Sequence, residues 1–325
     1  MTVVHESAGL LTKRPAVPVW ARSLAAAATL VALVSYLGVE PFLDGLRSVD
    51  GAALAAGAAI GLVTTICCAW RWTTVAHGLG LPLSFSSAVA ACYRSVFLNL
   101  TLPGGVVGDV HRGVSHGRRA RDVGLALRAV AWERSAGQVV QAGVTVAVLL
   151  LLPSPARPSI PILVGALAVA VIGIALLRRI PAGHGSSRWS QVRRAVAGDV
   201  RSALLARRAW PTVVLASVIV VFGNAITFVI AARTAGSSAP LSELLPLALL
   251  AMLAMVLPSI AGWGPREGAT AWAFAAAGLG AELGVATAVV YGVMILAASL
   301  PGAVVLVVAS LPRAAVAEAE GGMDA

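Results

Sequence analysis

Charged residues are scarce in this 325-residue sequence. Only 12% of its residues are charged and 58% are hydrophobic, whereas soluble domains carry about twice that share of charge. No stretch of soluble-type composition is long enough to form a separate catalytic domain. Several apolar runs instead reach the roughly 20 residues that a helix needs to cross a bilayer. The sequence therefore excludes an ordinary soluble enzyme and predicts an all-α, polytopic integral membrane protein.

Lysine, acidic residues and cysteine are also scarce. Lys13 is the only lysine among 24 basic residues, and the 14 acidic residues leave a net charge of +10. The arginines lie in loops between apolar segments, where cytoplasmic positive charge is common, so we expect no nucleic-acid partner. The three cysteines form no CxxC pair and no His/Cys cluster, and no phosphate-binding GxxxxGKS/T motif occurs. We therefore expect no metal, no cofactor and no nucleotide-driven step.

The apolar runs predict about six full spans and two further segments that are broken by proline and glycine. We expect one membrane domain over residues 23–312, between a cytoplasmic segment, 1–22, and a disordered tail, 313–325. Residues 178–210 are a basic cytoplasmic loop whose pattern fits a helix on an anionic lipid surface or a solvated loop helix. The predicted spans are 24–39, 51–70, 123–152, 162–177, 212–232 and 283–310, the last kinked at Pro301.

Two breaks, far apart in the chain, carry similar sequences. Residues 102–113 read Leu-Pro-Gly-Gly-Val-Val-Gly-Asp-Val-His-Arg-Gly, and residues 257–268 read Leu-Pro-Ser-Ile-Ala-Gly-Trp-Gly-Pro-Arg-Glu-Gly. Proline and glycine interrupt helices, and irregular backbone at membrane depth is tolerated only where it is buried in protein or lines a watery cavity. The paired breaks therefore predict a site. Their helix-breaking residues are Pro103, Gly104, Gly105, Gly108, Pro258, Gly262, Gly264 and Gly268.

The distribution of arginine predicts how the two breaks enter the membrane. If residues 178–210 are cytoplasmic, the basic run at 112–128 is cytoplasmic too, and Lys13 favours a cytoplasmic N-terminus. Both ends of segment 84–102 then lie on the cytoplasmic side, so we expect a re-entrant hairpin there; the alternative is an external N-terminus. The same counting makes 243–279 a hairpin from the outer face. Two broken hairpins of opposite entry fit an inverted repeat with a site between them.

The charged residues at the breaks are the first candidate substrate ligands. Glycine amides and helix starts favour an anionic group such as phosphate, and Arg112 and Arg266 would add charged hydrogen bonds to it. Asp109 and Glu267 would neutralise these arginines or contact a cationic head group. Trp263 would act as an amphipathic lid, although an interfacial anchor is an equally good interpretation of this residue.

Arg94, Glu133 and Arg134 complete the candidate set, because they lie within or at the margin of apolar segments. Ionised groups there are costly and need partners, and we expect Glu133 to pair with Arg94. A structural ion pair of Glu133 and Arg134 with other helices is the alternative, as is an interfacial position for Arg94. We interpret Arg71 as an interfacial anchor at the end of the second span, and Asn99 and Asn224 as hydrogen-bonding groups between helices.

The breaks resemble the two signatures of the lysylphosphatidylglycerol synthase transmembrane family. Residues 97–112, Phe-Leu-Asn-Leu-Thr-Leu-Pro-Gly-Gly-Val-Val-Gly-Asp-Val-His-Arg, followed by Ala-Trp-Glu-Arg at 131–134, resemble the first signature. Residues 258–269, Pro-Ser-Ile-Ala-Gly-Trp-Gly-Pro-Arg-Glu-Gly-Ala, resemble the second, and 300–302 match its closing Leu-Pro-Gly. The chain departs from the pattern at Asp109, where Glu is common, and where Trp263 to Pro265 interrupt the expected glycines.

The resemblance implies a flippase-like membrane domain. In the bifunctional lysyl-lipid synthases this domain moves aminoacylated phosphatidylglycerol, and a separate cytoplasmic domain after the spans transfers the aminoacyl group. Only residues 311–325 follow the last predicted span, so we expect no such transferase domain here. The substrate itself does not transfer with the fold.

The sequence therefore predicts a protein of the bacterial cytoplasmic membrane, with a cytoplasmic N-terminus, that translocates a phospholipid or lipid-linked substrate. The head group would be anionic, and an aminoacylated head group is one of the forms that the sequence allows. One alternative is a membrane-embedded glycosyltransferase with a polyprenyl-phosphate donor, for which Glu40, Asp44 and Asp50 in an outer loop would supply the acid. Another is an accessory subunit of a cell-envelope lipid synthase. Membrane lipid is the expected partner, and a homo-oligomer or an envelope-synthase partner stays open.

Overall fold

The computed structural model describes residues 19–152, 154, 165, 195–207, 209–255 and 263–310, and these residues form helices and connections without a strand. Four of the helices are long and apolar enough to cross a membrane, and a fifth candidate is the pair α1 and α2, bent by 98°. The prediction of a polytopic helical membrane protein is confirmed. The bounds are α1 Val19–Leu37, α2 Glu40–Ser48, α3 Gly51–Gly78, α6 Val123–Leu151, α9 Ala209–Thr234 and α12 Ala281–Ser310.

Several sequence predictions fall outside the described residues. They concern most of the N-terminal segment, the span at 162–177, the larger part of the basic loop 178–210 and the C-terminal tail. The predicted span at 283–310 is present as α12, which continues as a helix through Pro301. The predicted spans at 123–152 and 212–232 are present as α6 and α9. The prediction that residues 84–102 form a hairpin by themselves is wrong: residues 85–101 form one uninterrupted helix, and the return arm of the hairpin is a helix at 107–120, part of which the sequence assigns to a cytoplasmic basic run.

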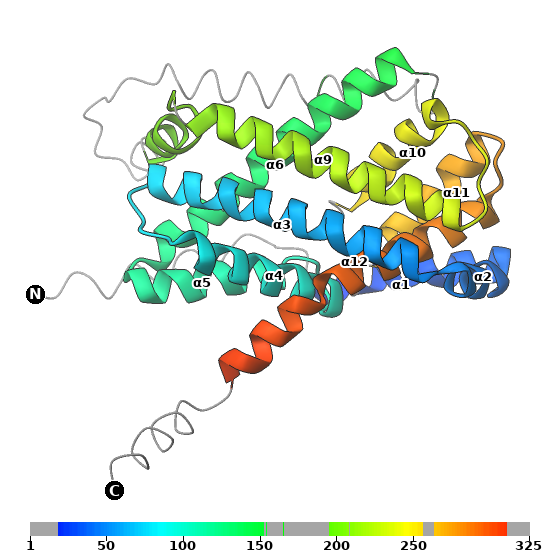
Figure 1. Ribbon diagram of the computed structural model, residues 1–325, viewed down its shortest axis with the longest axis horizontal. Coiled ribbons are helices and arrows are strands. Elements are labelled where there is room, and N and C mark those ends of the chain that lie inside the picture. The colour runs from blue at the N-terminus through cyan, green and yellow to red at the C-terminus, as the bar shows by residue number, and fades with distance from the viewer. Residues whose placement is uncertain are drawn as a thin grey trace, which may run out of the picture.

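The long helices begin where their sequences provide caps. Asp50 precedes α3, and its carboxylate accepts a hydrogen bond from the backbone amide of Ala53 at 2.7 Å. Asp122 precedes α6 and accepts from the amide of Leu125 at 2.8 Å. A capping carboxylate satisfies an amide that has no partner in the first turn of a helix. Two of the helices, α3 and α9, pack side by side and run in opposite directions (Figure 1).

Two short helical hairpins complete the described fold. Helices α4 (Phe85–Thr101) and α5 (Val107–Ala120) pack against each other, as do α10 (Leu241–Ala254) and α11 (Pro265–Ala276). In Figure 1 the first hairpin opens toward the end of the molecule where α3 finishes, and the second opens toward the end where α9 finishes. Their breaks lie toward the middle, so the two hairpins point at each other from opposite ends.

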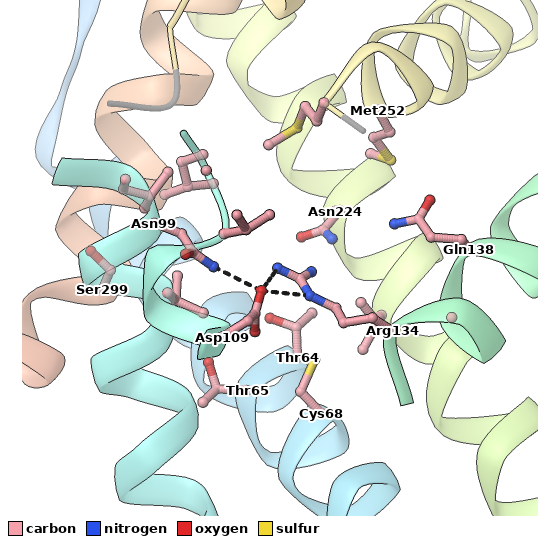
Figure 2. A pocket seen from close by; sticks show the side chains of 18 of the residues that line it. Thr64, Thr65, Cys68, Asn99, Asp109, Arg134, Gln138, Asn224, Met252 and Ser299 are labelled. Carbon is pink, nitrogen blue, oxygen red and sulfur yellow. Dashed lines mark hydrogen bonds and ion pairs between the residues drawn. The ribbon is translucent and has the colours of Figure 1, made fainter. Parts of the chain in front are cut away.

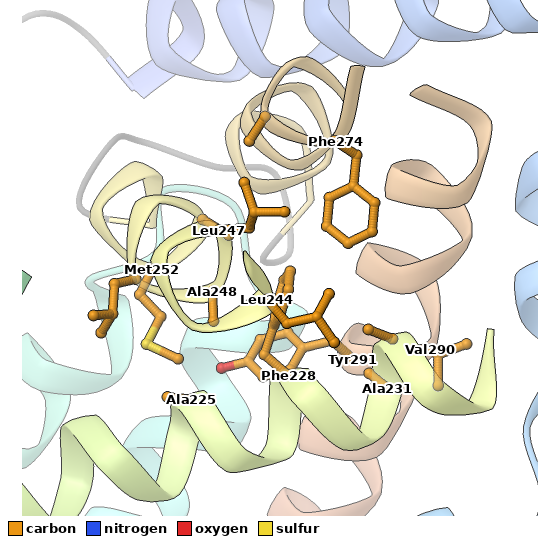
Figure 3. Packing of buried hydrophobic residues seen from close by; sticks show 14 of the residues in the cluster. Ala225, Phe228, Ala231, Leu244, Leu247, Ala248, Met252, Phe274, Val290 and Tyr291 are labelled. Carbon is orange, nitrogen blue, oxygen red and sulfur yellow. The ribbon is translucent and has the colours of Figure 1, made fainter. Parts of the chain in front are cut away.

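Each hairpin packs on its own apolar core. The first core lies among α3, α4 and α6 and is built around Trp72, Val75 and Cys92. The second lies among α9, α10, α11 and α12, where Phe228, Leu244 and Phe274 are fully buried (Figure 3). Outward-facing apolar side chains, such as those on α3 and α9, suit contact with lipid.

The described end of the basic loop packs on the bundle. Val200, in the π-helical turn η2 (Val200–Leu204), is fully buried, and Ala203 lies against Gly78 at the end of α3. Asp199 accepts a hydrogen bond from Trp132 Nε1 at 3.1 Å and pairs with Arg128 at 3.4 Å. In this stretch the apolar side of the loop therefore contacts protein.

Candidate functional site

The first break is a turn of glycines between α4 and α5. Gly104 and Gly105 have φ angles of 103° and 67°, which side chains with a Cβ rarely adopt. Gly108, in the first turn of α5, lies directly against the backbone carbonyl of Ser95, so that a Cβ at this position would overlap it. These glycines allow the chain to reverse and bring the start of α5 close to α4.

A network of five charged side chains, four of which are buried, lies behind this break. The Glu133 carboxylate bridges two guanidinium groups, accepting from Arg71 Nε at 2.7 Å and from Arg112 Nη2 at 2.5 Å. Asp109 bridges the next pair, accepting from Arg112 Nε at 3.0 Å and from Arg134 Nε at 2.8 Å. Three arginines thus share two carboxylates, which leaves one net positive charge. Arg134 is the exposed member, with 46% of its side chain accessible, whereas Arg112 is 4% accessible.

Polar side chains of α4 hold Asp109 in place. Ser95 Oγ and Asn99 Nδ2 donate to its two carboxylate oxygens at 3.0 and 3.1 Å. Asn99 Oδ1 also accepts from the backbone amide of Gly108 at 2.8 Å, which caps α5 from the neighbouring helix. Figure 2 shows Asn99, Asp109 and Arg134 joined in this way at the edge of a pocket.

The second break carries a smaller buried ion pair. Arg266 Nε donates to Glu267 Oε1 at 2.9 Å, while the backbone amide of Gly264 donates to Glu267 Oε2 at 2.6 Å. Glu267 therefore caps α11 and neutralises Arg266 at the same time. The Arg266 guanidinium also lies 5.4 Å from the ring centres of both Trp263 and Tyr291. Arg266 and Glu267 are 2% and 0% exposed.

The two breaks place an acidic residue at the same position of a helix. Asp109 is the third residue of α5, and Glu267 is the third residue of α11. Carboxylates are stabilised in the first turn, where helix amides and the helix dipole are positive. The equivalence agrees with the predicted relation between the breaks, although only Glu267 bonds to the backbone of its own helix.

A cavity of about 620 Å³ lies where the two breaks meet. The glycine turn of the first break, the facing ends of α10 and α11, and parts of α3, α6, α9 and α12 line it (Figure 2). Its described charged and polar lining includes Asn99, Asp109, Arg134, Asn224, Arg266 and Tyr291. Ionised groups next to both breaks are thus collected around one cavity inside an otherwise apolar fold.

The structure sorts the predicted site residues into three groups. Asp109, Arg134 and Arg266 line the cavity, together with Gly104 and Gly105. Residues immediately behind the lining hold these groups: Arg112, Glu133, Glu267 and Gly108. Outside the described lining are Arg94 and Trp263, and Trp263 packs against the apolar cluster of Ala271, Val285 and Val289. Pro258 and Gly262 lie outside the described residues.

The expected pair of Glu133 and Arg94 is not formed. Glu133 is occupied by Arg71 and Arg112, and Arg94 Nε has no hydrogen-bond partner within the described part of the chain. Arg71 is the residue that the sequence interpretation missed, because Trp70 and Trp72 beside it suggest the end of a span. The helix instead continues to Gly78, which makes α3 28 residues long and places Arg71 5% exposed inside the bundle. The length of this helix, from Gly51 to Gly78, is the feature that could have indicated an internal position for Arg71.

These features define a polytopic helical membrane protein in which two broken hairpins, pointing at each other from opposite ends, meet at a cavity with charged, polar and apolar lining. The chain belongs to the family described as the lysylphosphatidylglycerol synthase TM region, whose sequence profile matches residues 19–302. The predicted membership of this family is thereby confirmed. A comparison with curated protein sequences found no match.

Gly292 of α12 provides a test of the position of Arg266. A Cβ at this position would come within 2.5 Å of Arg266 Nη2. We expect Gly292→Ala to displace the guanidinium from its place beside Glu267 and to lower the free energy of unfolding by about 1–2 kcal/mol, because the added Cβ crowds a buried ion pair. The measurement is thermal unfolding followed by tryptophan fluorescence, and an unchanged midpoint would show that Arg266 does not lie against α12.

Proposed function

We propose that this protein translocates a lipid with a phosphate-containing, anionic head group across the cell membrane, with its N-terminus in the cytoplasm. The head group would pass through the cavity between the two hairpins while the acyl chains stay in the bilayer. The proposal is supported by the charge of the site, where Arg71, Arg112, Arg134 and Arg266 face only three carboxylates. An ionised lipid head group needs such counter-charges to leave water at an acceptable cost.

The observation that carries the proposal is the position and the accessibility of the Arg134 guanidinium. Its guanidinium lines the cavity and is the most accessible of the network, while Asp109 fixes it from one side. Such a group is oriented before a ligand arrives and keeps donors free for phosphate oxygens. Arg266 would contribute from the other hairpin. In this proposal Arg112, Glu133 and Glu267 hold the two contact arginines in position and do not touch the lipid.

Replacing Arg134 tests this function directly. We expect Arg134→Ala to slow the transbilayer movement of fluorescent phosphatidylglycerol in proteoliposomes by about tenfold or more, because one charged hydrogen bond to the phosphate is lost. Arg134→Lys should restore part of the rate, since it keeps the charge without the planar fork. The measurement is the rate at which a membrane-impermeant reductant bleaches the labelled lipid.

Arg118→Ala is the matched control, because Arg118 is an exposed arginine of α5 away from the cavity. Its rate should equal that of the unmodified protein. Equal rates for Arg134→Ala, Arg134→Lys and the unmodified protein would contradict the proposed passage of the head group through the cavity.

The glycosyltransferase alternative is tested in parallel with Asp44→Asn. Asp44 forms an exposed ion pair with Arg47 at 3.6 Å, so we expect transport to be unaffected by this change.

A further inference from the structure

The lining of the cavity says more about the head group than that it is anionic. We infer that the cavity selects phosphate diesters whose second substituent is uncharged and rich in hydroxyl groups, such as glycerol or a sugar, over head groups that carry an ammonium group. This inference rests on the proposed function and narrows its substrate class. It depends on three properties of the lining: its carboxylates, its aromatic rings and its amides.

No carboxylate in the described lining is available to a cationic head group. Asp109 is the only acidic residue there, and its two oxygens already accept hydrogen bonds from two arginines, Ser95 and Asn99. Glu133 and Glu267 lie behind the lining and are committed to arginines as well. By sequence, the internal residues 153–194 and 256–262, which connect the described helices, contain no acidic residue.

Nor does the described lining offer a free aromatic surface. Proteins can bind quaternary ammonium groups without an unpaired carboxylate, on the faces of Trp and Tyr rings. Tyr291 is the only aromatic residue in the described lining, and the Arg266 guanidinium lies 5.4 Å from its ring centre. A second cation at this ring would face the charge of Arg266.

Amide side chains supply what a polyhydroxylated head group needs. Gln138 and Gln141 follow Arg134 on the same side of α6, because residues three and four apart share a helix face. Asn224 of α9 lies across from Gln138 and Arg134 in Figure 2. Gln141 Nε2 is buried without a hydrogen-bond partner in the described part of the chain. An amide both donates and accepts, as a hydroxyl does, so each can match one hydroxyl of the ligand.

These groups divide the head group between two parts of the site. The phosphate would lie against Arg134 and Arg266, and its uncharged substituent against Gln138, Gln141 and Asn224. A lysyl or choline substituent in the same place would bring an ammonium group next to arginines with no free counter-charge. Selection against such ligands then comes from repulsion and desolvation in addition to missing contacts.

The test compares two lipids that differ only in the aminoacyl group. The purified full chain is reconstituted with fluorescent phosphatidylglycerol or fluorescent lysylphosphatidylglycerol, and binding is measured separately by the thermal stabilisation that short-chain versions produce in detergent. We expect both the transport rate and the apparent affinity to favour phosphatidylglycerol by about tenfold or more, the scale on which buried unpaired polar groups discriminate. Equal values, or a preference for the lysyl lipid, would overturn the inference.

A single substitution should change the preference of the cavity for phosphatidylglycerol over lysylphosphatidylglycerol. Gln141→Glu adds a carboxylate to the lining, and we expect it to raise the relative affinity for lysylphosphatidylglycerol by about tenfold through one charge-assisted pair. Gln141→Met has a similar size without charge and should weaken phosphatidylglycerol binding without improving the lysyl lipid. If Gln141→Glu left the ratio of the two affinities unchanged, the amide would not face the head group.

The two readouts separate this inference from the proposed function. Preferential binding of phosphatidylglycerol without transport of either lipid would retain the selectivity and refute translocation. Equal transport of both lipids would support translocation and refute the selectivity. Retained thermal midpoints of the variants establish that each result concerns folded protein.

Discussion

Replacing Glu133 with glutamine is expected to lower the free energy of unfolding by about 3–5 kcal/mol, the cost of leaving a buried charge uncompensated. Glu133 is 1% exposed and bridges Arg71 and Arg112, which are themselves buried. Glutamine keeps the shape of the side chain but removes its charge, so two guanidinium groups lose their shared counter-ion inside the bundle. The measurement is reversible unfolding in mixed micelles, followed by tryptophan fluorescence.

Asp44→Asn is the matched control for this change. Asp44 also pairs with an arginine, but the Asp44 and Arg47 side chains are 66% and 70% exposed. An exposed ion pair contributes about 0–1 kcal/mol, so the control should unfold nearly as the unmodified protein does. Equal effects of the two substitutions would mean that water reaches Glu133 and that the network is not a buried one.

Gly108→Ala is expected to be the second most damaging single change, with a loss of about 2–3 kcal/mol from overpacking. The added Cβ would overlap the Ser95 carbonyl, and backbone atoms of α4 cannot rotate away as a side chain can. The start of α5 would have to move, and the hydrogen bonds from Ser95 and Asn99 to Asp109 would lengthen or break. We therefore expect loss of lipid movement in proteoliposomes as well as a lower thermal midpoint.

Gly143→Ala separates this effect from that of removing any helical glycine. Gly143 lies in α6, and a Cβ there would meet no atom within 4 Å. Its replacement should be neutral or slightly stabilising, because alanine has the higher helix propensity. If Gly108→Ala behaved like Gly143→Ala, the close contact between α4 and α5 would not exist in the membrane.

The sequence predicts the helices and the breaks well because these depend on local features. Apolar runs indicate the positions of α3, α6 and α9, and the Leu-Pro-Gly-Gly turn at 102–105 ends α4, whereas the Leu-Pro-Gly at 300–302 lies within the continuous helix α12. The meeting of Asp109 and Arg266 at one cavity also follows from charge counting along the chain. Each of these predictions uses residues that are neighbours in sequence or whole segments treated as units.

The pairing of individual charges could not be predicted in the same way. Whether Glu133 meets Arg94 or Arg71 depends on the rotation of three helices about their axes and on their relative depth. Arg71 seemed to end its span because it lies between two tryptophans, yet α3 continues for another two turns. Likewise, only the packed structure distinguishes the exposed Arg134 from the enclosed Arg112. These are tertiary properties, which one sequence without its relatives leaves undetermined.

Helix α12 contacts both hairpins through glycines. Gly292 faces the guanidinium of Arg266 in the second hairpin, and Gly302 lies against the backbone of Tyr93 in the first. At about 1.5 Å per residue these two contacts are about 15 Å apart along the helix. Pro301, which removes one backbone hydrogen bond, lies between them. The helix therefore couples the two hairpins. If the hairpins shift against each other, α12 must either move along its axis as a rigid body or bend at Pro301.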